Sequence, residues 1–394
     1  MDKQKFTYKV YDAKTRSFIY EEDFTSDNPF KDIAERMSKE DISHGSLYIV
    51  AENENGQEAA YTIVKKSGTK FVKYEHCDFP LSYIDFDIEP RYLTCIDEVY
   101  NHYKYYEITF DKDNLRTNVR YGRIGADKND TFGEREYDYP LSMYWVKYYE
   151  KLSKGYEDKS ELKDFDNRQK KGTEYEPVKD KYSKSLIEFL IRKQKDYVES
   201  NYSTGAAFSM EAVKKSEKIL EELKAYADSS FSNKQFKIRE LFKELVTILP
   251  RRIADVSNYL NYITGLSSEA LMEHIEQEED LLNNFKDLYV KKENEAEEKA
   301  DNKDILEANN LTATCTDYKD IHMIEDKLDK DMAAMKTVLA VKNRYTNDRY
   351  IACKKEKGIE NRGCHLLWHG SRTENWWSIF KNGLTPVSYT HLRA

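Results

Sequence analysis

The sequence predicts a multidomain α+β protein, and three observations lead to this prediction. Segments that alternate apolar and polar residues around turn-forming dipeptides occupy the N-terminal third of the chain. From Ser183 to about Val290, apolar residues instead recur at the spacing of one helix face. With 394 residues, the chain is long enough for two to four domains, each with its own core.

Composition and charge restrict the class of protein. Charged residues make up 34% of the chain and apolar residues 39%, which is typical of a soluble protein with polar surfaces. No long apolar run occurs and the start MDKQKFTYKV lacks the apolar core of a signal peptide, so we expect no membrane partner. A net charge of −9 argues against a protein that coats nucleic acid, but one local contact surface remains compatible with it.

The cysteines indicate a reducing compartment. There are five of them, they are scattered, and no C-x-x-C occurs. An odd number without metal-ligand spacing favours neither a disulfide framework nor a zinc site. An intracellular location is therefore the better interpretation.

Residues 1–92 are predicted as a small α/β unit of unknown function. Asn28-Pro29 is a typical helix start, and Phe30–Ser38 follows it as a helix. Four segments alternate in the manner of strands, the last two around an Asn-Glu-Asn-Gly turn: Phe6–Tyr11, Ser17–Tyr20, Leu47–Val50 and Ala60–Lys65.

Residues 95–170 are predicted to begin with strands and to end with a helix. Tyr105–Phe110 and Thr117–Tyr121 are strand-like and are joined by a turn-rich segment. Leu141–Leu152 reads as an aromatic-rich helix that packs over their sheet.

Residues 178–335 follow a polar linker and are predicted as an all-α bundle. One helix carries an apolar stripe at spacings of three and four residues: Val213, Ser216, Leu220, Leu223 and Ala227. The next stripe, from Ile238 to Leu249, is stopped by Pro250. Within this range, the dense mixed charge of residues 291–310 predicts a solvated helix or a flexible linker.

The run Arg120-Tyr121-Gly122-Arg123-Ile124-Gly125 ends a predicted strand and is the first functional motif. Glycine on either side of Arg123 lets the backbone turn closely, so Tyr121 and Arg123 can present a ring and a cation at the sheet rim. Such a pair suits contact with a phosphate and a terminal sugar or base. The alternative interpretation is an ordinary β-turn with a solvated arginine.

The second motif is Leu366–Arg372, a predicted buried strand followed by His-Gly-Ser. Gly370 exposes a backbone N–H and C=O, Ser371 adds a hydroxyl, and His369 can bond to a ribose hydroxyl. This set suits a planar carboxamide attached to a dinucleotide. His365 and His369 could instead bind a metal on a helix, but H-E-x-x-H is absent, so we expect no metal.

Together these motifs resemble the DNA-dependent poly(ADP-ribose) polymerase family. The run ending at Gly125, with Lys104–Ile108 before it, resembles the WGR domain, although Tyr121 stands where that family usually has Trp. The helices before Pro250 resemble its helical regulatory domain. Leu366–Arg372, followed by Thr373, Ile379 and Asn382-Gly383-Leu384, resembles the start of its catalytic domain.

The resemblance implies an organisation and an activity. Residues 95–170 would be a WGR domain, 178–335 the helical regulatory domain, and 336–394 the N-terminal fragment of an ADP-ribosyltransferase α/β fold. The implied function is that of a nuclear glycosyltransferase that uses NAD as substrate, modifies protein acceptors and is activated by DNA breaks during repair. No metal is implied.

The resemblance also implies site residues. His369 would hold the adenosine-side ribose, Gly370 and Ser371 would bind the nicotinamide carboxamide, and Arg372 belongs to the same NAD-binding stretch. Tyr121, Gly122 and Arg123 would contact damaged DNA ends or nicks.

The family's nicotinamide-stacking Tyr and its catalytic Glu do not occur after His369 in the sequence given. We therefore expect this chain by itself to be a truncated, inactive form, and we expect residues 336–394 to be poorly ordered. The alternative is a non-catalytic module that binds DNA ends or serves as a scaffold.

Overall fold

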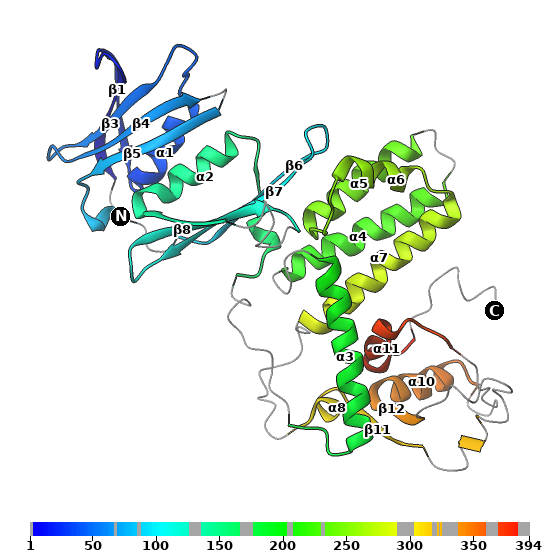
Figure 1. The fold of residues 1–394 in the computed structure, drawn as a ribbon. Helices are drawn as coiled ribbons and strands as arrows, with labels where there is room; N and C mark the ends of the chain where they lie inside the picture. The colour runs from blue at the N-terminus through cyan, green and yellow to red at the C-terminus, as the bar shows by residue number, and fades with distance from the viewer. Residues whose placement is uncertain are drawn as a thin grey trace. The chain divides into compact units, whose positions relative to one another are not determined.

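The computed structural model describes residues 3–66, 69–84, 88–125, 135–165, 176–202, 208–229, 233–289, 303–316, 321–322, 324, 338–359 and 369–384. It is a mixed α+β structure with antiparallel sheets (Figure 1), as the sequence predicted. It separates into two compact units. The first unit comprises Met1–Phe165 with Gln235–Gly265, and the second comprises Asp166–Lys234 with Leu266–Ala394.

The first unit begins with a five-stranded antiparallel sheet in the order β2-β1-β3-β4-β5. Its strands are β1 (Gln4–Asp12), β2 (Phe18–Ser26), β3 (Leu47–Asn53), β4 (Glu58–Lys66) and β5 (Thr69–Cys77). The helix α1 (Pro29–Lys39) starts as predicted, because the Asn28 side chain accepts a hydrogen bond from the Lys31 N–H and Pro29 occupies the first turn. The sequence analysis did not predict β5.

The second sheet of this unit also has five strands, in the order β10-β6-β7-β8-β9. They are β6 (Arg91–Asp97), β7 (His102–Asp111), β8 (Arg116–Arg123), β9 (Arg135–Pro140) and β10 (Glu157–Asp158). The predicted strands lie in β7 and β8, whereas β6 and β9 were missed. The predicted helix at Leu141–Leu152 is present as the 3₁₀ turn η2 (Leu141–Met143) followed by α2 (Tyr144–Leu152).

One hydrophobic core joins the two sheets of the first unit. The helix α1 packs against α2, and Ile33, Met37 and Val146 are buried there together with residues of both sheets. On β5, the Lys70 Nζ donates to three carbonyl oxygens at the end of α1, those of Met37 (2.7 Å), Ser38 (3.0 Å) and Glu40 (2.8 Å). This lysine therefore caps the helix from the neighbouring sheet.

Replacing Lys70 by methionine is expected to lower the free energy of unfolding by about 1–3 kcal/mol, because half-buried carbonyl groups lose a charged donor. Chemical denaturation measures this difference. Lys73→Met, at an exposed position of the same strand, is the control and should stay within about 0.5 kcal/mol of the unaltered chain. Equal stability of the two variants would show that Lys70 does not cap α1.

Two helices complete the first unit, α5 (Lys234–Ile248) and α6 (Val256–Thr264). The first ends just before Pro250, as predicted. Its buried side chains are those of the predicted stripe, together with Phe242 and Val246: Ile238, Leu241, Phe242, Leu245, Val246 and Ile248.

The second unit is built on three long helices, α3 (Lys181–Asn201), α4 (Met210–Ala227) and α7 (Ser268–Tyr289). The α4 stripe is confirmed, since all five predicted residues are buried. The side chains of Asp180 and Ser209 accept hydrogen bonds from the first turns of α3 and α4, which fixes where each helix begins.

The remainder of the second unit packs on α3. It consists of α8 (Ile305–Ala308), the antiparallel pair β11 (Leu311–Cys315) and β12 (Leu339–Asn343), α10 (Arg344–Glu356), the turn η5 (Thr373–Asn375) and α11 (Trp376–Asn382). Its core consists of Ile187, Leu190, Leu306, Leu311, Ala313 and Trp377.

Two expectations for this region differ from the structure. Residues 303–310 end the segment predicted as a solvated helix or a flexible linker; they include a helix that Asp304 and Glu307 cap, but this helix is not fully solvated, because Leu306 is buried. Residues 336–394 were expected to be poorly ordered, but Trp377 is 3% exposed because α11 packs on α3. Residues 291–302, most of residues 317–337 and the predicted strand Leu366–Trp368 lie outside the described residues.

Candidate functional site

Tyr121 lies in a row of three tyrosines that crosses β7, β8 and β9. Its ring stacks on Tyr106, with centroids 5.5 Å apart and planes inclined by 24°, and on Tyr137, at 5.9 Å and 13°. Tyr121 packs against the core beneath α2 instead of standing at the rim, where the sequence analysis expected it. The outer ring of the row, Tyr137, is 48% exposed. The row therefore offers water-accessible aromatic surface at the β9 edge.

A lysine from α2 lies over this row. The Lys151 Nζ is 4.2 Å from the ring centroid of Tyr106, 5.6 Å from that of Tyr121 and 5.4 Å from that of Tyr156. Burial, assisted by the neighbouring lysines and opposed by Glu150, lowers the pKa of Lys151 to about 8. The ammonium is thus held by ring faces and loses much of its hydration.

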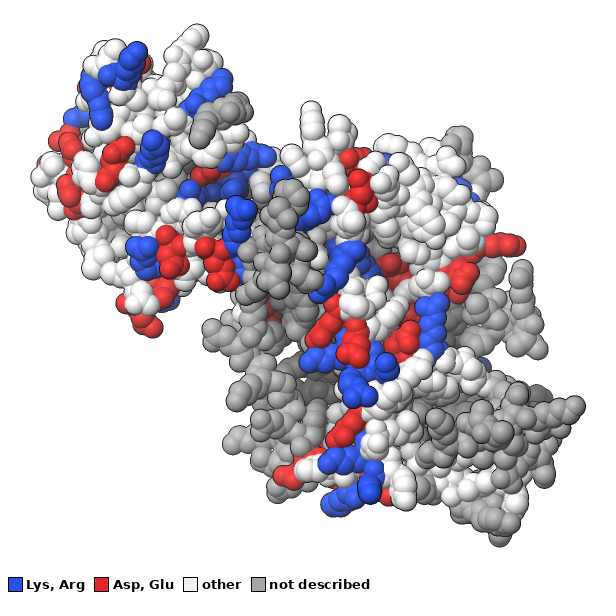
Figure 2. Space-filling model, viewed as in Figure 1, with Lys and Arg blue, Asp and Glu red and all other residues white. Residues whose placement is uncertain are grey.

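Further cations surround this position. Lys104, Lys147 and Lys154 lie close enough to Lys151 to influence its ionisation. Burial opposes ionisation of Glu150, yet Lys147, with its Nζ 3.2 Å from the Glu150 carboxylate, and Lys154 hold the Glu150 pKa below its ordinary value. On the face drawn in Figure 2, basic and acidic side chains are interspersed. We call Lys104, Lys147, Lys151 and Lys154 the α2 lysine cluster.

The lowered pKa of Lys151 gives a pH-dependent stability. Between pH 8 and the ordinary lysine value of 10.5, the unfolded chain holds a proton that the folded chain has released. The free energy of unfolding should therefore rise with pH across this window, by on the order of 1–3 kcal/mol. Tyr156, with a pKa of about 12, stays neutral there.

Chemical denaturation at pH 8.0 and at pH values up to about 10 measures this rise. Lys151→Met should remove it, whereas Lys39→Met, at an exposed position of α1, should not. The assignment is wrong if both variants keep the full rise.

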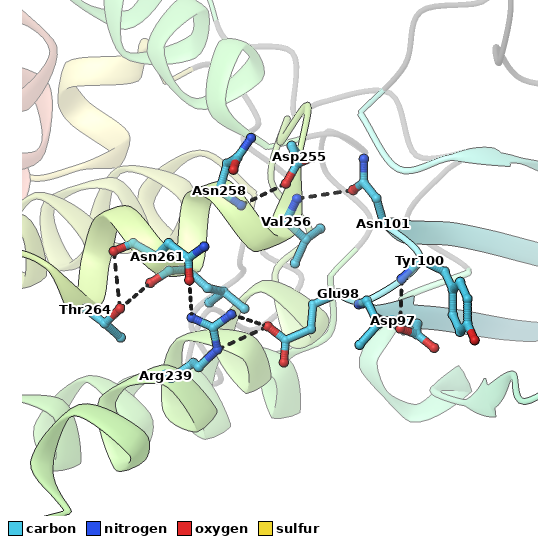
Figure 3. A network of polar contacts seen from close by, with 12 residues as sticks. Asp97, Glu98, Tyr100, Asn101, Arg239, Asp255, Val256, Asn258, Asn261 and Thr264 are labelled. Carbon is cyan, nitrogen blue, oxygen red and sulfur yellow. Dashed lines mark hydrogen bonds and ion pairs between the residues drawn. The ribbon is translucent and has the colours of Figure 1, made fainter.

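Arg123 does not point into solvent. Its Nη1 donates to the Asn101 carbonyl oxygen (3.0 Å), and its Nη2 donates to Asn101 Oδ1 (3.0 Å) and to the Ala254 carbonyl oxygen. Asn101 Oδ1 also accepts from the Val256 N–H at 3.3 Å, next to the start of α6 (Figure 3). Arg123 therefore joins the β6–β7 turn to the segment before α6, and its predicted contact with DNA stays a prediction.

A second arginine binds the same turn. On α5, Arg239 donates from Nε to the Glu98 carboxylate at 3.1 Å, and its Nη1 donates to Asn261 Oδ1 at 2.9 Å (Figure 3). The fully buried Tyr103 adds two contacts: its hydroxyl accepts a hydrogen bond from the Arg251 N–H at 2.8 Å and donates one to the Val246 carbonyl oxygen. We call these contacts, with those of Arg123, the β6–β7 joint.

The last glycine of the motif is part of this joint. Gly125 has φ +84°, and a Cβ at this position would lie 2.8 Å from the Arg252 Cα and 3.2 Å from the Arg251 carbonyl oxygen. Glycine is thus required both by the backbone conformation and by the close approach of another backbone. Gly122 lies opposite Tyr105 within the β7–β8 ladder.

The predicted NAD-binding residues lie between β12 and α11 in the chain. The His369 ring meets Trp376 edge-on, with centroids 6.1 Å apart. Gly370 is exposed, and a Cβ built on it would meet nothing within 4 Å. The polar groups of Gly370 and Ser371 make no hydrogen bond within the described part of the chain. A carboxamide needs one donor and one acceptor, and this segment has both available.

Polar side chains of α3 and α7 hold the residues that follow Arg372. Asn375 donates to Asp280 Oδ2 (2.9 Å) and accepts from the Asn284 amide (2.8 Å). Asn284 in turn accepts from the Gln194 amide at 2.8 Å, and both of these side chains are buried. Burial raises the Asp280 pKa, although Asn375 and Arg372 oppose the rise. This segment is thus fixed by a hydrogen-bonded chain and not by apolar packing alone.

No protein-family model matches the chain, and no curated protein matches it. Within the described ranges, no three His, Cys, Asp or Glu side chains come together to form a group that could hold a metal ion. None of the helices described combines the length and the apolar composition needed to cross a lipid bilayer.

Proposed function

We propose that this chain is the DNA-sensing and regulatory part of an NAD-dependent ADP-ribosyltransferase of the poly(ADP-ribose) polymerase type. It would act on protein acceptors in the nucleus during DNA repair. The observation that carries the proposal is the order of the two motifs, Arg120–Gly125 and Leu366–Arg372, with the helices between them. One motif occurs often by chance, whereas two in this order with helical stripes between them do not.

The DNA contact is proposed for the surface formed by the tyrosine row and the α2 lysine cluster. Lysines bind phosphates largely through charge, and an exposed ring such as that of Tyr137 can stack on a terminal base or sugar. Three lysines around the buried Glu150, with Lys104 close to Lys151, support this role in a chain whose net charge is −9. Tyr121, Gly122 and Arg123 would connect this surface to the β6–β7 joint.

The NAD contact is proposed for His369, Gly370, Ser371 and Arg372. NAD supplies an ADP-ribosyl group whose bond to nicotinamide breaks during transfer to an acceptor. Within the described residues the polar groups of Gly370 and Ser371 make no hydrogen bond, so they can orient the carboxamide, and His369 can hold a ribose hydroxyl. The contacts of Asn375 with Asp280 and Asn284 support control of this segment by α7.

Substituting both Lys147 and Lys154 by glutamine is expected to weaken binding to a nicked duplex by about ten-fold or more at physiological salt. The slope of log affinity against log salt should fall by roughly two, since each phosphate contact contributes about 0.9. Fluorescence anisotropy measures both quantities. Lys3→Gln with Lys39→Gln, which removes two exposed lysines elsewhere, is the charge-matched control.

The Arg123→Ala variant separates a direct contact from an indirect one. A phosphate contact by Arg123 predicts a loss of about 1–3 kcal/mol in DNA binding and a smaller salt slope. A role confined to the β6–β7 joint predicts lower stability with the salt slope unchanged. Equal DNA affinity of the unaltered chain, the double lysine variant and Arg123→Ala would contradict the proposed DNA contact.

A further inference from the structure

The outer face of the N-terminal sheet carries a line of side chains that crosses all five strands. The register places these residues directly opposite one another from β2 to β5: Phe18, Tyr11, Tyr48, Thr62 and Lys73. The buried side chains of β1, namely Phe6, Tyr8 and Val10, alternate with this set and belong to the face that packs on the core. Three aromatic rings therefore lie on the face that the core does not use.

These rings form a contiguous, accessible cluster. Tyr11 meets Phe18 edge-on with centroids 5.9 Å apart, and it meets Tyr48 at 6.2 Å. Phe18 is 56% exposed. Exposed aromatic rings contribute little to the stability of the fold, and contiguous exposed apolar surfaces typically mark binding sites.

A preformed turn places a cation on this cluster. In the β1–β2 turn, Asp12 Oδ1 accepts from the N–H groups of Lys14 (3.0 Å) and Thr15 (2.6 Å). Arg16 follows with φ +58°, an uncommon conformation for a residue other than glycine. Its guanidinium carbon lies 3.5 Å from the centroid of the Tyr48 ring. Within the described residues the guanidinium has no hydrogen bond or ion pair, so all its donors remain available to a ligand.

The charge around the rings favours an anionic ligand. Lys14, in the same turn, and Lys73, at the far end of the line, are exposed and make no ion pair within the described ranges. Acidic groups farther along the same face are already paired, Glu52 with Lys9 and Asp23 with Lys5. The ring cluster is thus bordered by the cations of Arg16, Lys14 and Lys73, whereas the carboxylates of Glu52 and Asp23 are paired with lysines.

We propose that this face binds single-stranded nucleic acid. Phosphates would lie against Lys14 and Lys73, and bases would stack on Tyr11, on Phe18 and on the plane of the Arg16 guanidinium, which the Tyr48 ring supports from the other side. A single strand is favoured over a duplex, because exposed side-chain rings can stack only on bases that are free of their neighbours. The surface is separate from the tyrosine row on β7–β9, and the inference does not depend on the proposed enzymatic function.

Fluorescence anisotropy of the full chain with a labelled oligothymidylate of about 15 nucleotides tests the proposal. Arg16→Gly removes the guanidinium and also relaxes the left-handed backbone, so the turn should persist. Tyr48→Leu removes the ring that holds the Arg16 guanidinium in place but keeps an apolar side chain. Each variant should bind at least about ten-fold more weakly, whereas Lys39→Gln, on α1 at the opposite face, should bind as the unaltered chain does.

Two variants distinguish this site from the DNA contact proposed for the α2 lysine cluster. The Lys147→Gln, Lys154→Gln double variant should lose binding to a nicked duplex and keep binding to the oligothymidylate. Absence of oligothymidylate binding, or unchanged binding in Arg16→Gly and Tyr48→Leu, would overturn the proposal. Equally strong competition by polyglutamate would also overturn it, because it would reveal recognition of charge without stacking.

Discussion

Replacing Glu107 by alanine should lower the free energy of unfolding by about 3–5 kcal/mol, the largest loss we expect from a single substitution. Glu107 on β7 is 2% exposed, and its carboxylate lies 3.6 Å from the Lys163 Nζ and 3.6 Å from Arg120. Lys163 is itself buried and lies over the Tyr92 ring. Without the carboxylate, an ammonium group stays in the interior with its main counter-charge missing.

A double variant tests whether the loss comes from the uncompensated charge. Glu107→Leu together with Lys163→Met removes both charges and should recover most of the loss, since apolar side chains of similar volume can replace a buried ion pair. Glu157→Ala removes an acid whose side chain is 71% exposed, beside Lys159, and should change stability by less than about 1 kcal/mol. Chemical denaturation gives all three values, and a double variant as unstable as Glu107→Ala would contradict the explanation.

Substituting Gly125 by alanine should cost about 2–5 kcal/mol, from two separate causes. Left-handed backbone strain contributes about 1–2 kcal/mol, and the clash of the new Cβ with the Arg252 backbone contributes the rest. Gly155→Ala is the matched control, because Gly155 has φ +82° with nothing within 4 Å of a built Cβ. Its loss should be confined to the strain.

The difference in unfolding free energy between Gly125→Ala and Gly155→Ala measures the cost of the close backbone approach in the β6–β7 joint. Limited proteolysis should also show faster cleavage between Leu249 and Ala254 in Gly125→Ala than in Gly155→Ala, because the joint opens first where its backbones are pushed apart. Identical unfolding free energies and identical cleavage would mean that Arg251–Arg252 moves aside without cost.

The elements that the sequence predicted well are those with a periodic pattern or a local stop signal. The α4 stripe and the end of α5 before Pro250 follow from spacing and from the geometry of proline. The strands β6 and β9 were missed for a physical reason. In β6 three consecutive residues, Tyr92–Thr94, are buried, and β9 is mostly exposed, so neither alternates.

For the candidate site, too, the local motifs could be predicted from the sequence, whereas their partners could not. The two motifs are local in sequence, so Tyr121–Arg123 and His369–Arg372 could be found without a structure. The partners could not, because Arg239 and Glu98 are 141 positions apart and nothing in either segment pairs them. Only the folded chain shows that Gly125 faces the Arg252 backbone, or that Lys151 lies over three tyrosine rings.

Transfer of labelled ADP-ribose from NAD tests the central claim most directly. The protein expressed from its natural gene would be incubated with labelled NAD, with and without DNA that carries nicks or free ends. The proposed function predicts labelling that depends on broken DNA and that falls in the Lys147→Gln, Lys154→Gln double variant. Binding to broken DNA without any transfer would contradict the enzymatic claim and would identify the protein as a non-catalytic DNA-end-binding module.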